Sequence, residues 1–195
     1  LANSAEPWKI PELSEIPKMV PKFHQNPEGF SPYLRDPETY SRPWALPGTP
    51  GLEHRLGGLE KDEFTGNISY EQENHETMVH IRAKKVQKLA KNFPKLKVLG
   101  PEKGRVLVVG WVGPYGHPVS SVHLEYLFPF PEALGSLLKN FNQVLVPELN
   151  TGQLAQVLRS TFLVDAISLS KVQGRPFLVH EIQHAITNLL DSPDS

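Results

Sequence analysis

The chain has 195 residues, of which 39% are hydrophobic and 21% charged, and its formal net charge is −1 at pH 7. This composition is typical of a globular protein with its own core, and the balanced charge gives no reason to expect a nucleic-acid or anionic-membrane partner. The chain has no cysteine, which excludes disulfides, thiolate zinc sites and a cysteine-held iron–sulfur cluster in these residues.

We do not expect the first residues of this sequence to form a signal peptide. The first residues, LANSAEPWKIP, lack the basic and apolar regions of a signal peptide. No apolar run approaches the roughly 18 residues that a membrane span needs. With the absence of cysteine, this fits a cytoplasmic protein. Since the sequence does not begin with methionine, we interpret it as a piece of a longer chain.

Residues 1–73 are rich in proline and aromatic residues. Ten of the nineteen prolines lie in the first fifty residues and leave no room for a helix of normal length. A solvated linker rarely contains so many aromatic residues. We therefore predict an extended, proline-rich arm that lies on another surface, with plain disorder as the alternative. The aromatic residues are Trp8, Phe23, Phe30, Tyr33 and Trp44.

Residues 74–93 are predicted to form a connecting helix. Asn74 is a suitable N-cap, and Pro94 would end the helix. Apolar residues recur at spacings of three and four, which indicates one buried stripe and an opposite basic face exposed to solvent. The predicted stripe consists of Val79, Ala83, Val86, Ala90 and Phe93.

Residues 97–195 alternate between predicted strands and helices, which favours an α/β domain with a parallel sheet. The helices begin at Pro131, after the predicted cap Thr151, and at Pro176 or Phe177, the last one continuing to about Leu190. The strands are expected at residues 105–111, 119–128, 143–148 and 163–170.

The connection between the first two of these strands is unusually short. Only the seven residues VGPYGHP separate Trp111 from Val119. Neighbouring parallel strands normally need a crossover of a dozen or more residues. We therefore expect either a different connection or a missing crossover helix, and in the second case an exposed apolar strand surface.

The sequence HEIQH, His180 to His184, has the H-E-x-x-H form of a zinc protease helix. Such a site needs a third ligand, and the eleven residues that follow offer only Asp191 and Asp194. An amphipathic stripe of Val179, Ile182, Ile186 and Leu189 explains the helix without zinc. We predict no zinc here, and a metalloprotease is the third and least favoured function.

Other motifs of catalysis are missing. GWVGPYG is followed by a predicted strand, whereas a phosphate-binding loop precedes a helix. The sequence contains no G-x-S-x-G, no P-loop lysine and no G-D-G signature of thiamine enzymes. The residues therefore predict no catalytic, cofactor-binding or metal site in this chain.

Several motifs in one order nevertheless resemble a known family, the α subunits of the 2-oxoacid:ferredoxin oxidoreductases, most closely the 2-oxoglutarate type. They are RPWALPGTPGLEHRLGGLEKDEFTGNISY, NHETMVHIRAKKV, VLVVGW, HLEYLFPFP, QVLVPELNTGQL and FLVDAISLSKVQGRPF. The resemblance covers nearly the whole chain. It implies the C-terminal region of that subunit, which comprises an arm and a domain like the transketolase C-terminal domain.

The resemblance also implies an activity for the whole enzyme. Such enzymes decarboxylate a 2-oxoacid oxidatively to an acyl-CoA and pass electrons to ferredoxin. Thiamine diphosphate, magnesium and an iron–sulfur cluster belong to the β subunit, and coenzyme A is a substrate. Family members also carry a helix between the GW and HLEYLF motifs that is absent here, and they show no H-E-x-x-H.

The expected role is therefore a non-catalytic scaffolding region that contacts the β subunit and the upstream α-subunit domains. Arginine is enriched in interfaces, and our candidate contact residues are Arg42, Arg55 and Arg175. This chain alone is predicted to be inactive. The alternative is a freestanding α/β interaction module without enzyme activity.

Overall fold

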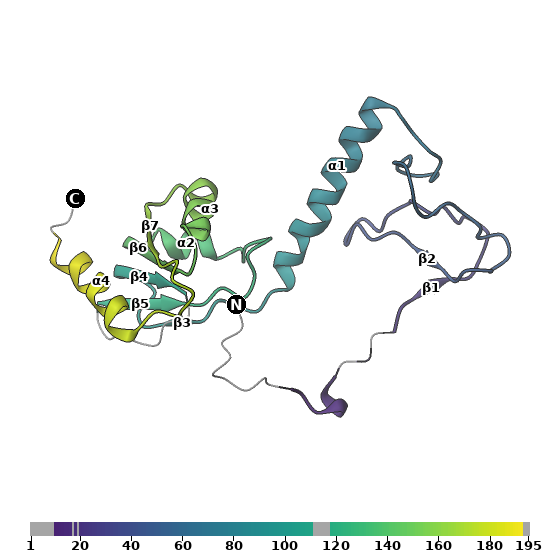
Figure 1. The fold of residues 1–195 in the computed structure, drawn as a ribbon. Helices are drawn as coiled ribbons and strands as arrows, with labels where there is room; N and C mark the ends of the chain where they lie inside the picture. The colour runs from purple at the N-terminus through teal and green to yellow at the C-terminus, as the bar shows by residue number, and fades with distance from the viewer. Residues whose placement is uncertain (1–9, 17, 19, 111–117, 193–195) are drawn as a thin grey trace. The chain divides into compact units, whose positions relative to one another are not determined.

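The structure is a computed structural model that describes residues 10–16, 18, 20–110 and 118–192. The chain divides into two compact units, residues 1–82 (unit 1) and residues 83–195 (unit 2). Figure 1 shows that the regular elements of unit 2 form a layered α/β fold. No helix among the described residues is long and apolar enough to cross a membrane.

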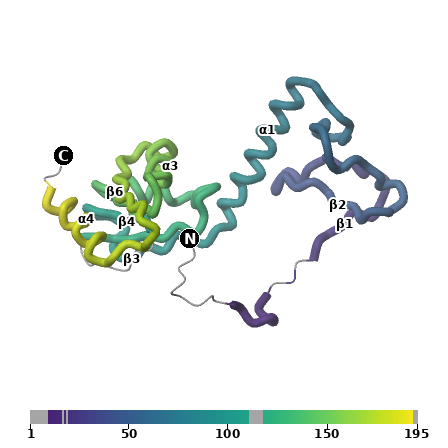
Figure 2. The backbone as a smooth tube through the Cα atoms, in the orientation of Figure 1, coloured from purple at the N-terminus to yellow at the C-terminus, as the bar shows by residue number. Residues whose placement is uncertain are grey.

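Unit 1 has little regular structure before its helix, and the tube in Figure 2 follows an irregular path there. Strands β1 and β2 are parallel, with Phe23 opposite Trp44. The only buried hydrophobic residues among those described in this unit are Tyr33, Leu52 and Met78. The elements are a 3-10 turn Leu13–Glu15, β1 Phe23–His24, β2 Trp44–Ala45 and α1 Gln72–Gln87, which extends past residue 82.

Helix α1 differs from its prediction in both ends and in its buried face. It begins at Gln72, ends at Gln87 and continues as the 3-10 helix Lys88–Asn92. The predicted N-cap Asn74 lies inside the helix, where its side chain accepts a hydrogen bond from the Glu63 amide and donates one to the Lys61 carbonyl. The buried position is Met78, and the neighbouring Val79 of the predicted stripe is exposed.

Unit 2 is built on a five-stranded sheet in the order β3-β5-β4-β6-β7. Strands β5, β4, β6 and β7 run parallel and β3 is antiparallel to β5. The expected α/β fold with a mostly parallel sheet is confirmed. The bounds are β3 Val98–Leu99, β4 Gly104–Val109, β5 Val119–Val122, α2 Leu134–Leu138, β6 Phe141–Glu148, α3 Gln153–Phe162, β7 Ala166–Ser170 and α4 Val179–Asp191.

Helices cover both faces of this sheet (Figure 1). On one face, α2 and α3 pack through Leu138 and Leu158 against Leu107 and Val144. On the other face, α4 packs through Ile186. Val179, the first residue of the stripe predicted for α4, is exposed because the helix contacts the sheet only from its second turn onward.

Strands β4 and β5 are adjacent and parallel, with Val106 opposite Val119, although nine residues separate them. The expected absence of a crossover helix concerns residues 111–117, which lie outside the described part of the chain. The expected exposed strand surface is wrong, since every residue of β5 is at most 4% exposed. The strand also ends at Val122 rather than Phe128, and Tyr126 stacks on Phe93 with 3.9 Å between ring centroids.

Candidate functional site

The carboxyl ends of parallel strands are where α/β sheets usually bind ligands. At the end of β6, the side chain of Glu148 turns towards the first turn of α3 and is 6% exposed. Its carboxylate accepts hydrogen bonds from the amides of Leu154 at 2.6 Å and Ala155 at 3.1 Å. The hydroxyl of Ser168 donates to the same carboxylate at 3.4 Å. Glu148 therefore supplies the negative charge that the positive end of α3 favours.

Asn150 completes this cap. Its side-chain oxygen accepts hydrogen bonds from the amides of Gly152 at 2.9 Å and Gln153 at 3.0 Å. Gly152 has a φ of 96°, a left-handed conformation that L side chains rarely adopt. The prediction of Thr151 as the cap is therefore wrong. The four amides at residues 152–155 all bind the chain's own side chains, so none of them is open to a phosphate.

Lys171 fixes the loop that follows β7. Its side chain is 5% exposed, and its ammonium group donates to both oxygens of Glu181, at 2.8 Å and 2.5 Å. It also donates to the carbonyl of Pro176 at 3.1 Å and lies 5.5 Å from the ring centroid of Phe177. These contacts hold residues 171–178 against the start of α4.

Glu181, the glutamate of HEIQH, is therefore occupied by structural contacts. Besides Lys171, it accepts a hydrogen bond from the amide of Leu178 at 2.6 Å and so caps α4. The hydrogen bond from Lys171 lowers the pKa of Glu181, and that from Leu178 acts in the same direction. His180 and His184 are both exposed. The described residues contain no group of three histidines, cysteines or acids that could hold a metal ion.

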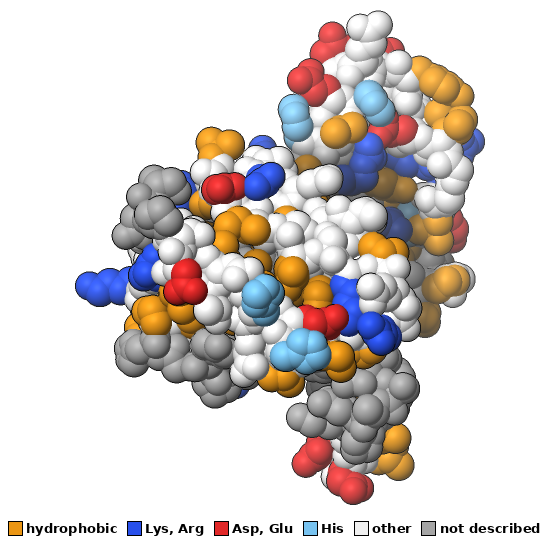
Figure 3. All heavy atoms as spheres, turned by 60° about the vertical axis from the view of Figure 1, so that its left-hand side comes forward, with side chains coloured by type: hydrophobic (Ala, Val, Ile, Leu, Met, Phe, Trp, Pro, Cys, Tyr) orange, Lys and Arg blue, Asp and Glu red, His pale blue; other side chains and the backbone are white. Residues whose placement is uncertain are grey.

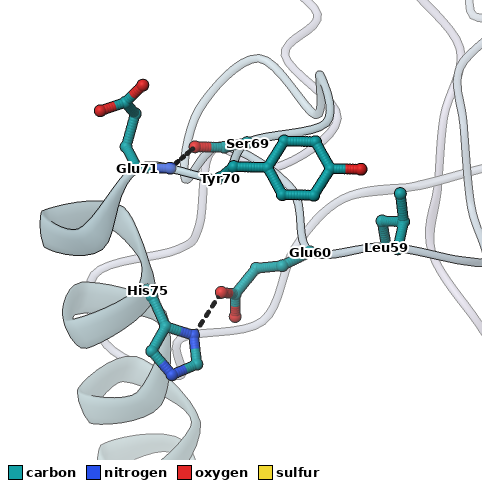
Figure 4. Close-up of a pocket in the computed structure, with 6 residues that line it drawn as sticks. All are labelled: Leu59, Glu60, Ser69, Tyr70, Glu71 and His75. Atoms are coloured by element: carbon teal, nitrogen blue, oxygen red, sulfur yellow. Dashed lines mark hydrogen bonds and ion pairs between the residues drawn. The ribbon is translucent and has the colours of Figure 1, made fainter.

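A hollow of about 410 Å³ lies in unit 1 between α1 and the segment before it. Figure 4 shows Glu60 directed towards His75 and Tyr70 at the rim. Glu60 accepts hydrogen bonds from His75 at 2.6 Å and from Arg82 at 2.9 Å, and these bonds, the one from His75 first, lower its pKa. Because the His75 ring and the Arg82 guanidinium both come from α1 and bind the same carboxylate, the group ties α1 to residue 60.

A smaller hollow of about 170 Å³ lies in unit 2 beside the stacked rings of Phe93 and Tyr126. No serine, threonine or cysteine nucleophile lines it. Its lining residues are Pro94, Lys95, Leu96, Lys97, His123, Glu125, Tyr126 and Pro131.

The three arginines selected as contact candidates have different surroundings. Arg42 is half-buried, and its guanidinium lies 5.0 Å from the ring centroid of Tyr33. Arg55 is exposed, as is Arg175, whose Nε donates to the neighbouring Gln173 side chain at 3.2 Å. Their contact role stays a prediction.

Both units expose many large hydrophobic side chains. On the face drawn in Figure 3, such side chains lie in several separate groups between polar and charged ones. In unit 1, many large hydrophobic side chains are more than half exposed, which is unusual for a unit of this size. They include Ile10, Leu13, Val20, Leu34, Trp44, Leu46, Leu56, Leu59, Phe64 and Tyr70.

Sequence reasoning missed Glu148, Asn150 and Lys171. The segment PELNTGQL, a glutamate at a strand end followed by asparagine and glycine before a helix, carried the signal for the α3 cap. The Lys171–Glu181 pair had no such signal, because the lysine follows β7 and the glutamate lies in α4.

Comparison with known proteins finds relatives of this chain, although no family model matches it. It is 44% identical over 93% of its length to the 2-oxoglutarate oxidoreductase subunit KorA of Mycobacterium tuberculosis. It also resembles the 2-oxoglutarate:ferredoxin oxidoreductase from Magnetococcus marinus, solved with 2-oxoglutarate, coenzyme A and succinyl-CoA bound, with a TM-score of 0.82, 25% identity and 93% of this chain covered. The chain spans 30% of the first protein and 34% of the second.

Proposed function

Because this chain is homologous to a segment of a 2-oxoglutarate:ferredoxin oxidoreductase subunit of the KorA type, we propose that it is the non-catalytic C-terminal region of such an α subunit. Its role is scaffolding: it contacts the upstream α-subunit domains and the β subunit of a cytoplasmic enzyme. Residues 97–195 correspond to a transketolase C-terminal-like domain, residues 74–93 to a connecting helix and residues 1–73 to the arm that precedes it. The whole enzyme converts 2-oxoglutarate and coenzyme A to succinyl-CoA and CO2, and passes the two electrons released to ferredoxin.

The observation that best supports a non-catalytic role is that the free amides at the start of α3 are already bound by side chains of this chain. In a parallel α/β sheet, a phosphate-containing cofactor commonly binds at such a helix start. Here Glu148 and Asn150 occupy the amides of residues 152–155, and the charge of Glu148 would repel an approaching phosphate. The arrangement stabilises the domain and leaves no amide of this helix start for a phosphate group.

The described residues do not fit thiamine diphosphate. The diphosphate needs a magnesium ion held by oxygen ligands, and the described part of the chain has no cluster of three acids or histidines for it. The family resemblance assigns this cofactor and the iron–sulfur cluster to the β subunit of the proposed enzyme, and we propose that this chain performs no step of the chemistry.

Unit 1 supports the assembly role. Its described residues bury Tyr33, Leu52 and Met78 and leave aromatic and aliphatic side chains exposed, among them Trp44 at 57% and Tyr70 at 79%. A unit that buries so little apolar surface has little to offset the conformational entropy lost on folding. Contact with a neighbouring domain or subunit would cover these side chains.

The test compares the isolated chain with the whole enzyme. A 2-oxoglutarate-dependent dye-reduction assay is run on the chain, on the chain with β subunit, and on the full α subunit with β subunit. Calorimetry with thiamine diphosphate and magnesium is run on the chain alone. We expect turnover only when the full α subunit and the β subunit are both present. We expect no heat of thiamine diphosphate binding from the isolated chain. Turnover or tight cofactor binding by the isolated chain would overturn the proposal.

A further inference from the structure

We propose that Arg42, held on the ring of Tyr33, is the anchor through which unit 1 binds a carboxylate side chain of the β subunit. This inference rests on the proposed function and adds a residue and a partner chemistry to it. The group formed by Tyr33, Arg35 and Arg42, with Gly66 against the ring, is called the Tyr33 platform below.

The ring of Tyr33 is held in place within the platform. Tyr33 is 8% exposed, and its hydroxyl donates to the carbonyl of Leu56 at 3.4 Å. The chain passes so close to its ring that a Cβ on Gly66 would lie 2.7 Å from the ring atom Cδ2. The ring therefore forms a fixed surface on which a guanidinium can rest.

The two arginines of the platform differ in what they can still bind. Arg35 donates to the carbonyls of Tyr33 and Glu63, and its second terminal nitrogen faces the sulfur of Met78 at 3.4 Å. Its burial lowers its pKa, and the charge of Arg42 adds to this effect. The hydrogen bonds of Arg35 are thus directed into unit 1, where they hold residues 33 and 63 together.

Arg42, by contrast, has N–H donors that make no hydrogen bond within the described residues. It makes a single weak hydrogen bond, to the carbonyl of Pro32 at 3.5 Å, and its carbon Cζ lies 5.0 Å from the Tyr33 centroid. None of the acidic residues in the described part of the chain pairs with it. A guanidinium presents five donors in a planar fork that matches a carboxylate, and stacking on an aromatic ring fixes its orientation in advance. Once unit 1 is folded, this guanidinium loses little further entropy when it binds a carboxylate.

The surroundings favour a protein over a free phosphate. Leu34 adjoins Tyr33 and Arg35 in sequence and is 52% exposed. Phe64 and Trp44 lie two residues from Gly66 and Arg42 and are 53% and 57% exposed. Arginine with aromatic and aliphatic neighbours is typical of the strongest contacts in protein interfaces. A phosphate site would instead gather backbone amides or several free cations. The β subunit is a separate chain, whereas the upstream α-subunit domains are tethered to unit 1 at high effective concentration. An anchoring contact therefore matters more for binding the β subunit than for binding those domains.

The test measures association of the full α subunit with the β subunit at low and at physiological salt. Arg42→Gln should weaken binding by about 30-fold or more, as expected for a central interface arginine. Arg42→Lys, which keeps the charge and loses the fork, should weaken it by about tenfold. The matched control Lys22→Gln, an exposed unit 1 cation with no recorded contact, should change binding by less than about twofold.

Each outcome decides the matter. If wild-type α and β subunits do not associate, the proposed function fails and this inference with it. If they associate and both Arg42 variants bind like Lys22→Gln, the inference alone fails. Should Arg42→Gln lose the circular dichroism of the wild-type subunit, Arg42→Lys decides. If inorganic phosphate reverses the Arg42-dependent binding more than chloride of equal ionic strength does, the site takes phosphate and the carboxylate assignment is wrong.

Discussion

Unit 2 encloses two hydrophobic clusters, one on each face of its sheet, whereas the described residues of unit 1 bury Tyr33, Leu52 and Met78. Unit 1 is instead tied together by polar contacts, such as those of Arg35 and Asn74 with backbone groups. A polar contact adds about 1 kcal/mol, while a fully buried leucine adds about 2 kcal/mol. The contrast indicates a self-sufficient domain joined to a unit whose stability depends on a partner.

Truncation of buried side chains should separate the units most clearly. Leu158→Ala in α3 should lower the free energy of unfolding of the isolated chain by about 3 kcal/mol, since Leu158 is fully buried and a cavity would remain. Met78→Ala should lower it by less than about 1 kcal/mol, because unit 1 contributes little to the cooperative transition. Urea unfolding followed by circular dichroism measures both values. Equal losses would mean that unit 1 folds as firmly as unit 2.

Two glycines that lie against aromatic rings extend the same comparison, and Gly66 in addition has a φ of 76°. An added Cβ would lie 2.8 Å from the ring of Phe162 at Gly135, and 2.7 Å from the ring of Tyr33 at Gly66. We expect Gly135→Ala to lower the melting temperature of the isolated chain, with a cost of about 1–3 kcal/mol from overpacking. Gly66→Ala should leave that melting temperature unchanged and weaken binding to the β subunit. A drop in melting temperature with Gly66→Ala would contradict the account.

The α3 cap is a feature of unit 2 that substitution can weaken without removing core volume. Glu148→Gln keeps the shape but loses the charge that two amides and the helix dipole favour, so we expect a loss of about 1–2 kcal/mol in the free energy of unfolding. Glu132→Gln, a change at an exposed position, is the control. If both variants melt alike, Glu148 does not stabilise α3 in the way described.

The smallest expected effect is a dependence on pH. Because Lys171 lowers the pKa of Glu181 in the folded state, the pair stabilises the fold above the ordinary carboxyl pKa. That stability is lost as the pH falls through the lowered pKa, when Glu181 takes up a proton. Melting temperatures measured from neutral to acidic pH should therefore fall more steeply in the wild type than in Glu181→Gln. Parallel curves would show that the pair is not linked to folding.

The sequence predicted the sheet of unit 2 well, but it did not predict the polar contacts of either unit. Alternating strands and helices indicated the mostly parallel sheet, because buried β6 and amphipathic α3 have clear periodicities of their own. Asn74 was predicted to be an N-cap because that assignment uses only neighbouring residues in the sequence. In the structure, its side chain instead binds backbone groups of residues 61 and 63. Likewise, the sequence argued against zinc at HEIQH because a third ligand is missing, but it gave no sign that Glu181 pairs with Lys171. Contacts between segments distant in sequence leave no local pattern.

Hydrogen exchange of the isolated chain and of the chain mixed with the β subunit tests the central claim most directly. In the isolated chain, we expect slow exchange for the amides of β4, β6 and α3 and fast exchange for residues 20–70. With the β subunit present, residues 20–70 should become protected while unit 2 changes little. Slow exchange of residues 20–70 in the isolated chain, or no gain of protection with the β subunit, would contradict the proposed division between a self-sufficient domain and a partner-dependent unit.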